Sequence, residues 1–357
     1  MNMAAHDAGF DTPDSAFVFT GRWREFLPIA VTNLLLTIVT LGIYRFWATT
    51  RTRRYLWANT QFIDDRLEWA GTGGEMFRGF LVVLLLFVPA LLIVQSGIEA
   101  LAMRGELALA GLIAVIAYAG LIMLVGVARY RALRYRLSRT YWHGIHGGGT
   151  SGGWGYGASY LAKSLLGALP LGLAIPWSMT ALWNERWNAM GFGPHRFAAE
   201  ASTTGLMGRW LLVLASPVLV VLFLVPMLGL GAVAGATPSP VTAVFAVLLA
   251  YALIALLGAG YYAAFMREVI GNLALGPLRF TFTARTADWI RLFLGHALLV
   301  IGTLGLGAGF IAYRNWAFFI RHLEAMGHVD LDALTQSPDA TGGDAEGLAT
   351  AFDIGAI

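Results

Sequence analysis

Apolar residues gather in seven long stretches, which are separated by segments rich in arginine, tryptophan and polar residues. Each stretch approaches or exceeds the roughly 20 residues that a helix needs to cross the hydrocarbon core of a bilayer. We therefore predict seven helical membrane segments, at about residues 26–47, 79–98, 107–128, 161–183, 210–234, 241–266 and 292–313.

Two pairs of these stretches are predicted to form hairpins. The second and third stretches, and the fifth and sixth, consist mainly of Leu, Val, Ala, Ile and Gly. Their connectors, residues 99–106 and 235–240, are short, and the second contains the turn-forming run ATPSP. Apolar helices joined by such short turns lie side by side, so we predict two transmembrane helical hairpins.

The first, fourth and seventh stretches differ, because polar or helix-weakening residues interrupt them. These residues are Asn33 and Gly42 in the first, Pro170, Gly172 and Pro176 in the fourth, and Gly305, Gly307 and Gly309 in the seventh. Each stretch also continues into a segment rich in Trp and Arg, such as FWATTRTRRYLW after the first. Trp concentrates at membrane interfaces, and Arg there extends toward lipid phosphates. We expect these stretches to be broken and to end at the interface.

A recurring motif accounts for the alternation of the two kinds of stretch. The segments that begin at Arg66, Arg196 and Arg279 align without gaps, and weaker copies lie near residues 17 and 147. The motif alternates apolar and polar residues over four or five positions, which predicts a short β-strand. The spacing alternates between about 50 and 80 residues, so the period is about 130. We predict repeats at about residues 17–146 and 147–279, with a partial third at 280–330.

The basic residues distinguish two topologies. If all seven stretches span, 14 Lys and Arg lie on one side of the membrane and 10 on the other. If the first, fourth and seventh stretches dip in and return, only Arg104 lies on the far side, against 23 on the near side. Basic residues favour the cytoplasmic side, which supports the second arrangement, although Gly42 is a weak place for a chain reversal. The first arrangement would give inverted repeats, a common transporter architecture.

The composition agrees with a polytopic membrane protein. Hydrophobic residues make up 57% of the chain and charged residues 13%, about half the usual share in a soluble domain. The absence of cysteine excludes disulfides and thiolate metal sites. A polar segment, 1–16, and an acidic segment, 331–357, flank the membrane domain 17–330, and we expect the acidic segment to be disordered. The predicted fold is an all-α membrane domain of helical hairpins and broken or re-entrant segments, with short interfacial β-strands.

One segment carries a family resemblance. Residues 33–60, NLLLTIVTLGIYRFWATTRTRRYLWANT, followed by the Arg66 motif, resemble the YjgN-like family of bacterial inner-membrane proteins, and the likeness in architecture extends to about residue 330. The resemblance implies a multi-pass protein of the bacterial inner membrane, and the charge distribution places its C-terminus in the cytoplasm. The family is classed as a domain of unknown function, so the resemblance implies no activity and no cofactor.

Two groups of residues are candidates for binding sites. Arginines at the ends of apolar stretches set membrane topology, and they also bind anionic lipid headgroups. A polar residue deep in a membrane segment can line a substrate site. The lipid-headgroup or interface candidates are Arg51, Arg53, Arg54, Arg129, Arg131 and Arg134, and the candidates for a membrane-embedded polar site are Asn33 and Pro176.

No grouping of residues indicates catalysis. His143 and His146 lie in a Gly-rich loop, but two histidines fall short of the three or four ligands of a metal site. The run GGGTSGG lacks the Lys-Ser/Thr ending of a phosphate-binding loop, and no hydrolase motif is present. Glu75 and Asp288 occupy matched positions at helix starts, where a carboxylate caps the helix or pairs with a nearby arginine. We expect no enzymatic activity, no metal and no cofactor.

Two functional hypotheses follow. The first is a non-enzymatic, membrane-organising protein that binds anionic phospholipid or a membrane-protein partner, including a second copy of itself. The second is a transporter or channel built from inverted repeats around a midplane site. The central parts of the apolar stretches lack ionisable groups, which weakens the second hypothesis. Nucleic-acid binding is not expected, because the arginines lie at the ends of apolar stretches and not on a solvated basic face.

Overall fold

The computed structural model describes residues 16–233, 239–327, 329 and 335–336 of the chain. The predicted N-terminal segment 1–16 lies outside these residues except for Ala16, and so does the acidic segment 331–357 except for Thr335 and Gln336. Gln336 contacts the sheet, since its Nε2 donates a hydrogen bond to the Gly144 carbonyl over 2.7 Å.

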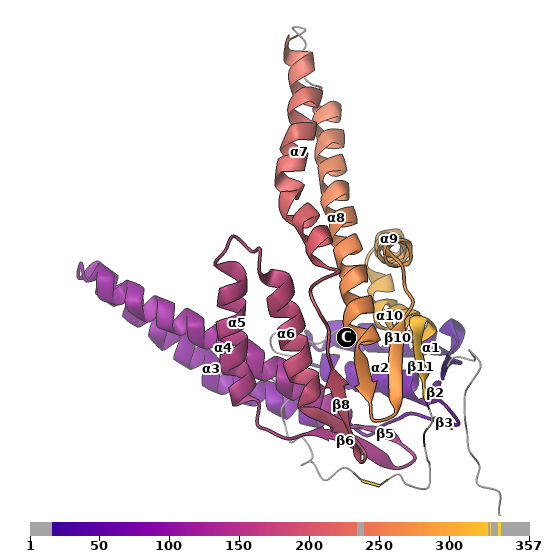
Figure 1. Ribbon diagram of the computed structural model, residues 1–357. Coiled ribbons are helices and arrows are strands. Elements are labelled where there is room, and N and C mark those ends of the chain that lie inside the picture. Colours follow the sequence, from indigo (N-terminus) through magenta and orange to yellow (C-terminus); the bar gives the residue numbers. More distant parts are fainter. Residues whose placement is uncertain (1–15, 234–238, 328, 330–334, 337–357) are drawn as a thin grey trace, which may run out of the picture.

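Five helical hairpins, alternately short and long, follow one another along the chain (Figure 1). The two long hairpins match the predicted transmembrane pairs. They consist of α3 (Gly73–Met103) with α4 (Leu107–Ser138), and of α7 (Met207–Val233) with α8 (Pro240–Gly271). Both begin at the strands, and they extend away from them in different directions (Figure 1).

The length and exposure of the long helices identify a helical membrane protein. Within the described residues, α3, α4 and α8 are long and apolar enough to cross a membrane, and α7 contains a shorter apolar part, Met207–Leu222. At 1.5 Å per residue, the 31 residues of α3 extend about 46 Å, beyond the roughly 30 Å of hydrocarbon. Only 6–11% of the most apolar windows of α3, α4 and α8 is buried. Exposed apolar surface of this extent requires lipid or protein to cover it.

The three short hairpins replace the first, fourth and seventh predicted stretches. They consist of α1 (Trp23–Val39) with α2 (Arg45–Ala58), of α5 (Trp154–Ala168) with α6 (Ile175–Asn188), and of α9 (Thr286–Gly302) with the short η1 (Leu306–Phe310) and α10 (Ile311–His322). In each, the chain reverses and both ends return to the strands. Residues 26–47 are therefore two helices and not one continuous span.

Each short hairpin turns at a leucine in the left-handed backbone region, followed by a glycine. The leucines are Leu41, Leu171 and Leu304, with φ of 50°, 52° and 51°. In the first turn, the N–H of Gly42, at φ 91°, donates to the Thr37 carbonyl over 2.7 Å, a bond that closes a helix C-terminus. The reversal at Gly42 that looked weak from the sequence is therefore stabilised by a helix-capping motif.

The strands are short, as predicted, but they join into one curled sheet. They are β1 (Phe17–Phe19), β2 (Thr60–Phe62), β3 (Asp65–Arg66), β4 (Glu68–Trp69), β5 (Thr140–Trp142), β6 (Ile145–Gly149), β7 (Met190–Phe192), β8 (His195–Ala199), β9 (Leu273–Leu275), β10 (Leu278–Phe282) and β11 (Leu323–Met326). Strands β4 to β11 form an eight-stranded sheet in chain order, and β1 to β3 form a three-stranded sheet. All of the pairs are antiparallel.

The two sheets continue into each other. Between β3 and β4, the Leu67 N–H donates to the Thr60 carbonyl over 2.9 Å, so these strands are one strand with a local break. At the far end, β1 contacts β11, the edge strand of the eight-stranded sheet, and the rings of Phe17 and of Phe280 on the adjacent β10 lie 6.5 Å apart. The described fold is therefore helical with a curled sheet, and the all-α class was too narrow. Strands lie at all five positions of the recurring motif, and the internal repeat itself stays a prediction.

Aromatic side chains from distant parts of the chain fill the core beside the curled sheet. Trp289 and Tyr130 are 1% exposed. Trp57 of α2 stacks on Trp316 of α10, with ring centres 4.1 Å apart. The Trp316 indole N–H donates to Thr60 Oγ1 over 2.8 Å. These contacts join the first and last hairpins, so the hairpins surround a common base.

Candidate functional site

The first arginine cluster, on α2, is partly used to hold its own hairpin together. Arg51 Nη1 donates to Asn33 Oδ1 over 3.3 Å and to the Tyr44 hydroxyl over 3.2 Å. The Arg53 guanidinium lies over the Trp69 ring, 4.8 Å from its centre. Arg51 and Arg54 are exposed. Arg53 is thus engaged with an aromatic ring, and Arg54 is oriented outward.

The two residues predicted to form a membrane-embedded polar site lie in different hairpins. Asn33 is 6% exposed and joins α1 to α2, because its Nδ2 donates to the Ala48 carbonyl at 3.2 Å and to Thr52 Oγ1 at 3.3 Å. Pro176 is buried in the first turn of α6, where the missing N–H of proline costs the helix nothing. The amide of Asn33 is therefore satisfied by its own hairpin, and the structure does not bring Pro176 to it.

The second arginine cluster, on α4, holds the loop that leads into α5. Arg131 Nε donates to the Gly152 carbonyl over 2.9 Å, and its guanidinium lies over the Trp154 ring at 5.5 Å. Arg134 Nη1 donates to the Ser151 carbonyl over 3.1 Å. Arg129 lies over the Tyr160 ring at 5.8 Å. Arg131 and Arg134 therefore position the entry to the second short hairpin.

Glu75 caps α3 as expected, and it pairs with Arg139, which lies outside the two predicted arginine clusters. Its carboxylate accepts from the Thr72 N–H over 3.4 Å, and the Thr72 side chain accepts from the Glu75 N–H, which is a capping box at the start of α3. The same carboxylate accepts from the Tyr135 hydroxyl at 2.8 Å and pairs with Arg139 at 2.9 Å. The start of α3 is thereby bound to the end of α4.

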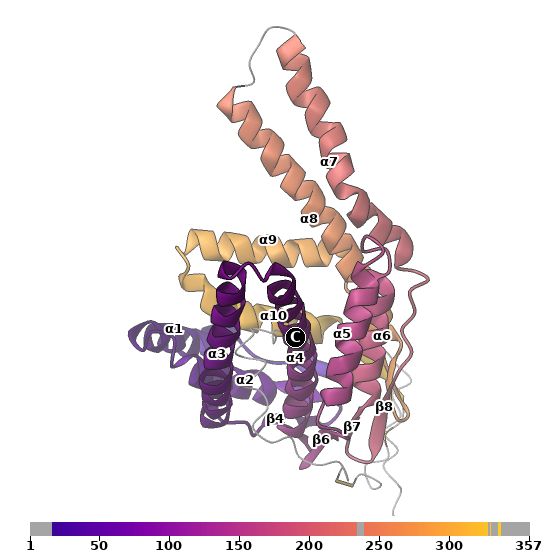
Figure 2. The ribbon, with the colours of Figure 1, turned by 90° about the vertical axis from the view of Figure 1, so that its left-hand side faces the viewer.

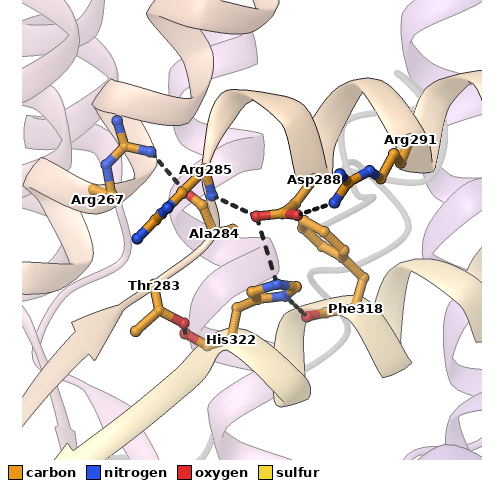
Figure 3. Close-up of polar contacts among 8 residues, drawn as sticks. All are labelled: Arg267, Thr283, Ala284, Arg285, Asp288, Arg291, Phe318 and His322. Atoms are coloured by element: carbon orange, nitrogen blue, oxygen red, sulfur yellow. Dashed lines mark hydrogen bonds and ion pairs between the residues drawn. The ribbon is translucent and has the colours of Figure 1, made fainter.

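Asp288 performs the matching roles at the start of α9 (Figure 3). Its Oδ2 accepts from the Arg285 N–H over 2.9 Å, and its Oδ1 pairs with Arg291 at 3.1 Å. Its Oδ2 also lies 4.0 Å from Nε2 of His322, whose Nδ1 is 2.8 Å from the Phe318 carbonyl. Asp288 thus joins the start of α9 to the end of α10, as Glu75 joins α3 to α4.

A third charged group, which the sequence did not single out, lies between α4, α5 and α6. Glu185 on α6 accepts a hydrogen bond from Ser159 over 2.6 Å and forms a very short ion pair with Lys163, both on α5. The Arg186 guanidinium lies over the Trp183 ring at 5.6 Å. Figure 2 shows α5 and α6 beside α4, which carries Arg129.

Burial shifts the ionisation of this third group. Burial lowers the pKa of the Arg186 guanidinium, and the positive charge of Arg129 acts in the same direction. Burial raises the pKa of the neighbouring Tyr156 hydroxyl, which donates to the Leu182 carbonyl over 3.3 Å. The sequence contained one indication of this group: Leu182 and Arg186 are four residues apart, so they lie on the same face of a helix. Their partners on α5 could not be identified from the sequence, because they face α6 only when the fourth stretch reverses.

The histidine loop acquires partners that are distant in sequence. His143 Nε2 lies 3.0 Å from Asp64, and its Nδ1 lies 3.8 Å from Asp65, so the turns of two β-hairpins meet. His146 Nδ1 lies 2.9 Å from the Gly147 carbonyl. Among the residues that the structure describes, no group of three or more His, Cys, Asp or Glu is placed to hold a metal ion.

The tips of the three short hairpins are apolar and unburied. Leu41, Leu171 and Leu304 are 93%, 84% and 94% exposed, among the highest values for large apolar residues in the described chain. Each tip therefore holds a large apolar side chain outward, in a backbone conformation that leucine rarely adopts.

A family model described as "Bacterial protein of unknown function (DUF898)" matches residues 14–351. Three curated relatives are each named "Inner membrane protein YjgN". The protein of Escherichia coli O157:H7 is 35% identical over 128 residues, which cover 36% of this chain and 30% of the relative. That of Salmonella typhimurium strain LT2 is 30% identical over 138 residues, covering 39% and 32%. That of Escherichia coli strain K12 is 38% identical over 86 residues, covering 24% and 22%.

The matched segments thus span a third or less of the length of these relatives. No solved structure matches the chain. The family model, by contrast, covers nearly the whole chain, and the apolar hairpins agree with the membrane location that the relatives' names print. The chain belongs to the YjgN-like DUF898 family of bacterial inner-membrane proteins of unknown function.

Proposed function

We propose that this protein is a non-enzymatic organiser of the inner membrane that binds anionic phospholipid headgroups at the cytoplasmic leaflet. One observation carries the proposal: most of the arginines lie toward the bases of hairpins whose outer surfaces are apolar, whereas Arg45, Arg104 and Arg314 lie nearer the tips. The apolar surfaces require lipid, and arginine at the edge of hydrocarbon binds phosphate as a planar, multi-donor cation.

Helix lengths support a position of these arginines at the level of the headgroups. On α4, Leu107 and Arg129 are 22 residues apart, or about 33 Å, close to the roughly 30 Å of hydrocarbon. On the neighbouring α5, Tyr160 contacts Arg129, and the tip at Leu171 lies 11 residues further on, about 16 Å of helix. That distance is about half of the hydrocarbon thickness. The short hairpins would therefore occupy one leaflet, while the long hairpins cross both.

The charge asymmetry supports a cytoplasmic position for the curled sheet. With the short hairpins reversing, Arg104 at the α3–α4 turn is the only one of the 24 Lys and Arg placed on the far side. The positive-inside tendency then favours a cytoplasmic position for the sheet, the hairpin bases and the C-terminus. The protein would be multi-pass with four spans, and its repeats would be parallel. Parallel repeats would weaken the main argument for transport, and the satisfied amide of Asn33 weakens the case for its proposed site.

The experiment measures the phospholipids that co-purify with the protein in mild detergent, by mass spectrometry, against their share in the source membrane. We expect enrichment of anionic phospholipid in the wild type and a reduced enrichment in the Arg51→Gln, Arg54→Gln double variant. Arg104→Gln is the matched control, because it removes one charge on the far side. A wild type with no anionic enrichment would refute the proposal, and stoichiometric capture of one membrane protein without lipid would favour a protein partner.

Topology is tested separately with single cysteines, which this naturally cysteine-free chain allows. Cysteines at the exposed strand positions Arg66 and Arg196 should both react with an impermeant maleimide from the cytoplasmic side only. Reaction from opposite sides would establish inverted repeats and return transport to consideration.

A further inference from the structure

The charged group between α4, α5 and α6 contains more positive than negative charge. Lys163 and Glu185 neutralise each other in an ion pair, with side chains 25% and 34% exposed. Arg129 and Arg186 remain, and each interacts with an aromatic ring and with no carboxylate among the described residues. The Nε of Arg186 is buried and has no hydrogen-bond partner.

The side chains of Arg129 and Arg186 are half-buried. A guanidinium partly removed from water without an anionic partner is costly, and stacking on an aromatic ring offsets only part of that cost. The positive charge of Arg129 also lowers the pKa of the Arg186 guanidinium, as repulsion between like charges does. The buried Nε leaves no room for a ligand, so an anion beside the two arginines would pair with the outer Nη groups of the Arg186 guanidinium and screen the repulsion. The ion pair of Glu185 with Lys163 leaves no described carboxylate to take that place.

The chemistry and position of the group select the anion. Arg129 is the first charged residue after the apolar run 107–128, so it lies where α4 leaves hydrocarbon. Arginine forks match the oxygen atoms of phosphate, and half-buried Tyr160 and Trp183 supply apolar walls suited to a glycerol backbone or acyl chain.

We propose that Arg129 and Arg186 form a binding site for one phosphate group of a phospholipid, between α4 and the second short hairpin. Lys163 and Ser159 orient Glu185 away from the phosphate and keep it from neutralising Arg186. This site deepens the proposed function and rests on it. It differs from the exposed arginines of α2, because it binds one lipid at a fixed position.

The test titrates full-length protein in neutral detergent with short-chain phosphatidylglycerol, and separately with inorganic phosphate, by calorimetry. Loss of one charge-assisted contact typically weakens binding about tenfold. We expect about this loss for Arg129→Gln and for Arg186→Gln, and little change for Arg66→Gln, which removes the same charge from an exposed strand. Glu185→Gln keeps the hydrogen bond to Ser159 and should tighten binding, a gain that misfolding cannot produce.

The result distinguishes the site formed by Arg129 and Arg186 from the general proposal that the protein binds anionic phospholipid. If the wild type binds phosphatidylglycerol but Arg129→Gln and Arg186→Gln weaken it no more than Arg66→Gln, the site is wrong and the general lipid-binding proposal survives. If the wild type shows no preference for phosphatidylglycerol over phosphatidylcholine, both fail. Binding of phosphatidylglycerol at least 100-fold tighter than inorganic phosphate identifies a lipid headgroup as the source, and equal binding identifies free phosphate. Recovery of binding in Arg186→Lys would show that charge alone suffices. A lack of recovery would show that the guanidinium fork is needed.

Discussion

The contact between α4 and α5 depends on two glycines, and it gives the sharpest test of the packing described above. A Cβ added at Gly157 would lie 2.9 Å from the Met123 carbonyl oxygen and 2.5 Å from Val127 Cγ2. A Cβ added at Gly126 would lie 2.5 Å from Tyr160 Cβ. The first clash includes backbone, so a rotamer change cannot relieve it, and the helices must separate.

The expected magnitude follows from two opposing effects. Alanine in a helix interior is favoured over glycine by up to about 1 kcal/mol, whereas overpacking costs roughly 1–3 kcal/mol. For Gly157→Ala, the clash should dominate, with a net loss of about 1–2 kcal/mol. For Gly120→Ala, whose Cβ meets nothing within 4 Å, only the helix preference remains, so stability should be equal or slightly higher. The two variants carry the same chemical change and share the helix preference, so they should differ by the clash alone, about 1–3 kcal/mol.

The assay is reversible unfolding in mixed micelles, followed by the fluorescence of the 12 tryptophans. Anionic-lipid binding is measured on the same samples, because separation of α4 from α5 also moves Arg129 away from Tyr160. The reasoning is refuted if Gly157→Ala and Gly120→Ala have the same stability. That result would mean that α4 and α5 are not in close backbone contact.

Three further changes probe the hairpins separately. Glu75→Gln should destabilise the protein by about 1–3 kcal/mol, because it weakens the capping box and leaves Arg139 without its carboxylate. The control is Glu68→Gln, at an exposed position. A shift in denaturant midpoint no larger than that of the control would contradict the prediction. Asn33→Leu should cost about 1–2 kcal/mol in unfolding experiments, since three hydrogen bonds between α1 and α2 are lost, and Thr32→Leu on the exposed face is its control. Gly42→Ala should cost about 1–2 kcal/mol through its φ of 91° alone, as its Cβ would meet nothing, and a neutral result would place that turn in another conformation.

The local elements could be predicted from the sequence because their causes are local. Runs of Leu, Val and Ala identify the long helices, and alternation over a few residues identifies the strands. Glu75 could be expected to cap a helix, because it lies three residues after Thr72. The reversal at Leu41 was harder to predict, since leucine rarely adopts positive φ. A signal was nevertheless present, because residues 40–42, 170–172 and 303–305 read TLG, PLG and TLG.

The tertiary contacts could not be predicted, because they join residues far apart in the chain. His143 meets Asp64 from 79 residues away, and Trp316 donates to Thr60 from 256 residues away. Composition and periodicity do not specify which hairpins are neighbours around a curled sheet. For the same reason, Arg129 was recognised as a candidate but its neighbour Arg186 was not, since the fold of α6 back along α5 brings them together.

The tips of the short hairpins are chemically suited to a position inside the membrane. Backbone that turns within hydrocarbon must satisfy its own polar groups, because no water is present to do so. At the last tip, Thr303 Oγ1 donates to the Leu299 carbonyl over 2.6 Å and accepts from the Gly307 N–H over 2.6 Å. At the first tip, Thr40 Oγ1 likewise donates to the Leu36 carbonyl and accepts from the Tyr44 N–H. The middle tip has Pro170 at this position, which has no hydroxyl, and there the Gly172 N–H donates to the Ala168 carbonyl and the Ile175 N–H to the Gly172 carbonyl.

If the last tip lies in hydrocarbon, the loss of the hydrogen bond from Gly307 to Thr303 has a consequence that it would not have in water. Thr303→Val keeps the shape of the side chain but leaves the Gly307 N–H without its acceptor, which costs several kcal/mol in hydrocarbon and little in water. With a reporter cysteine at Leu304, the wild-type tip should be closed to a water-soluble maleimide, and Thr303→Val should make it reactive. Thr32→Val is the control, because that threonine lies on α1 away from the tip. If the wild-type cysteine at Leu304 already reacts fully, the hairpin lies in water, and the one-leaflet insertion on which the proposed function depends is wrong.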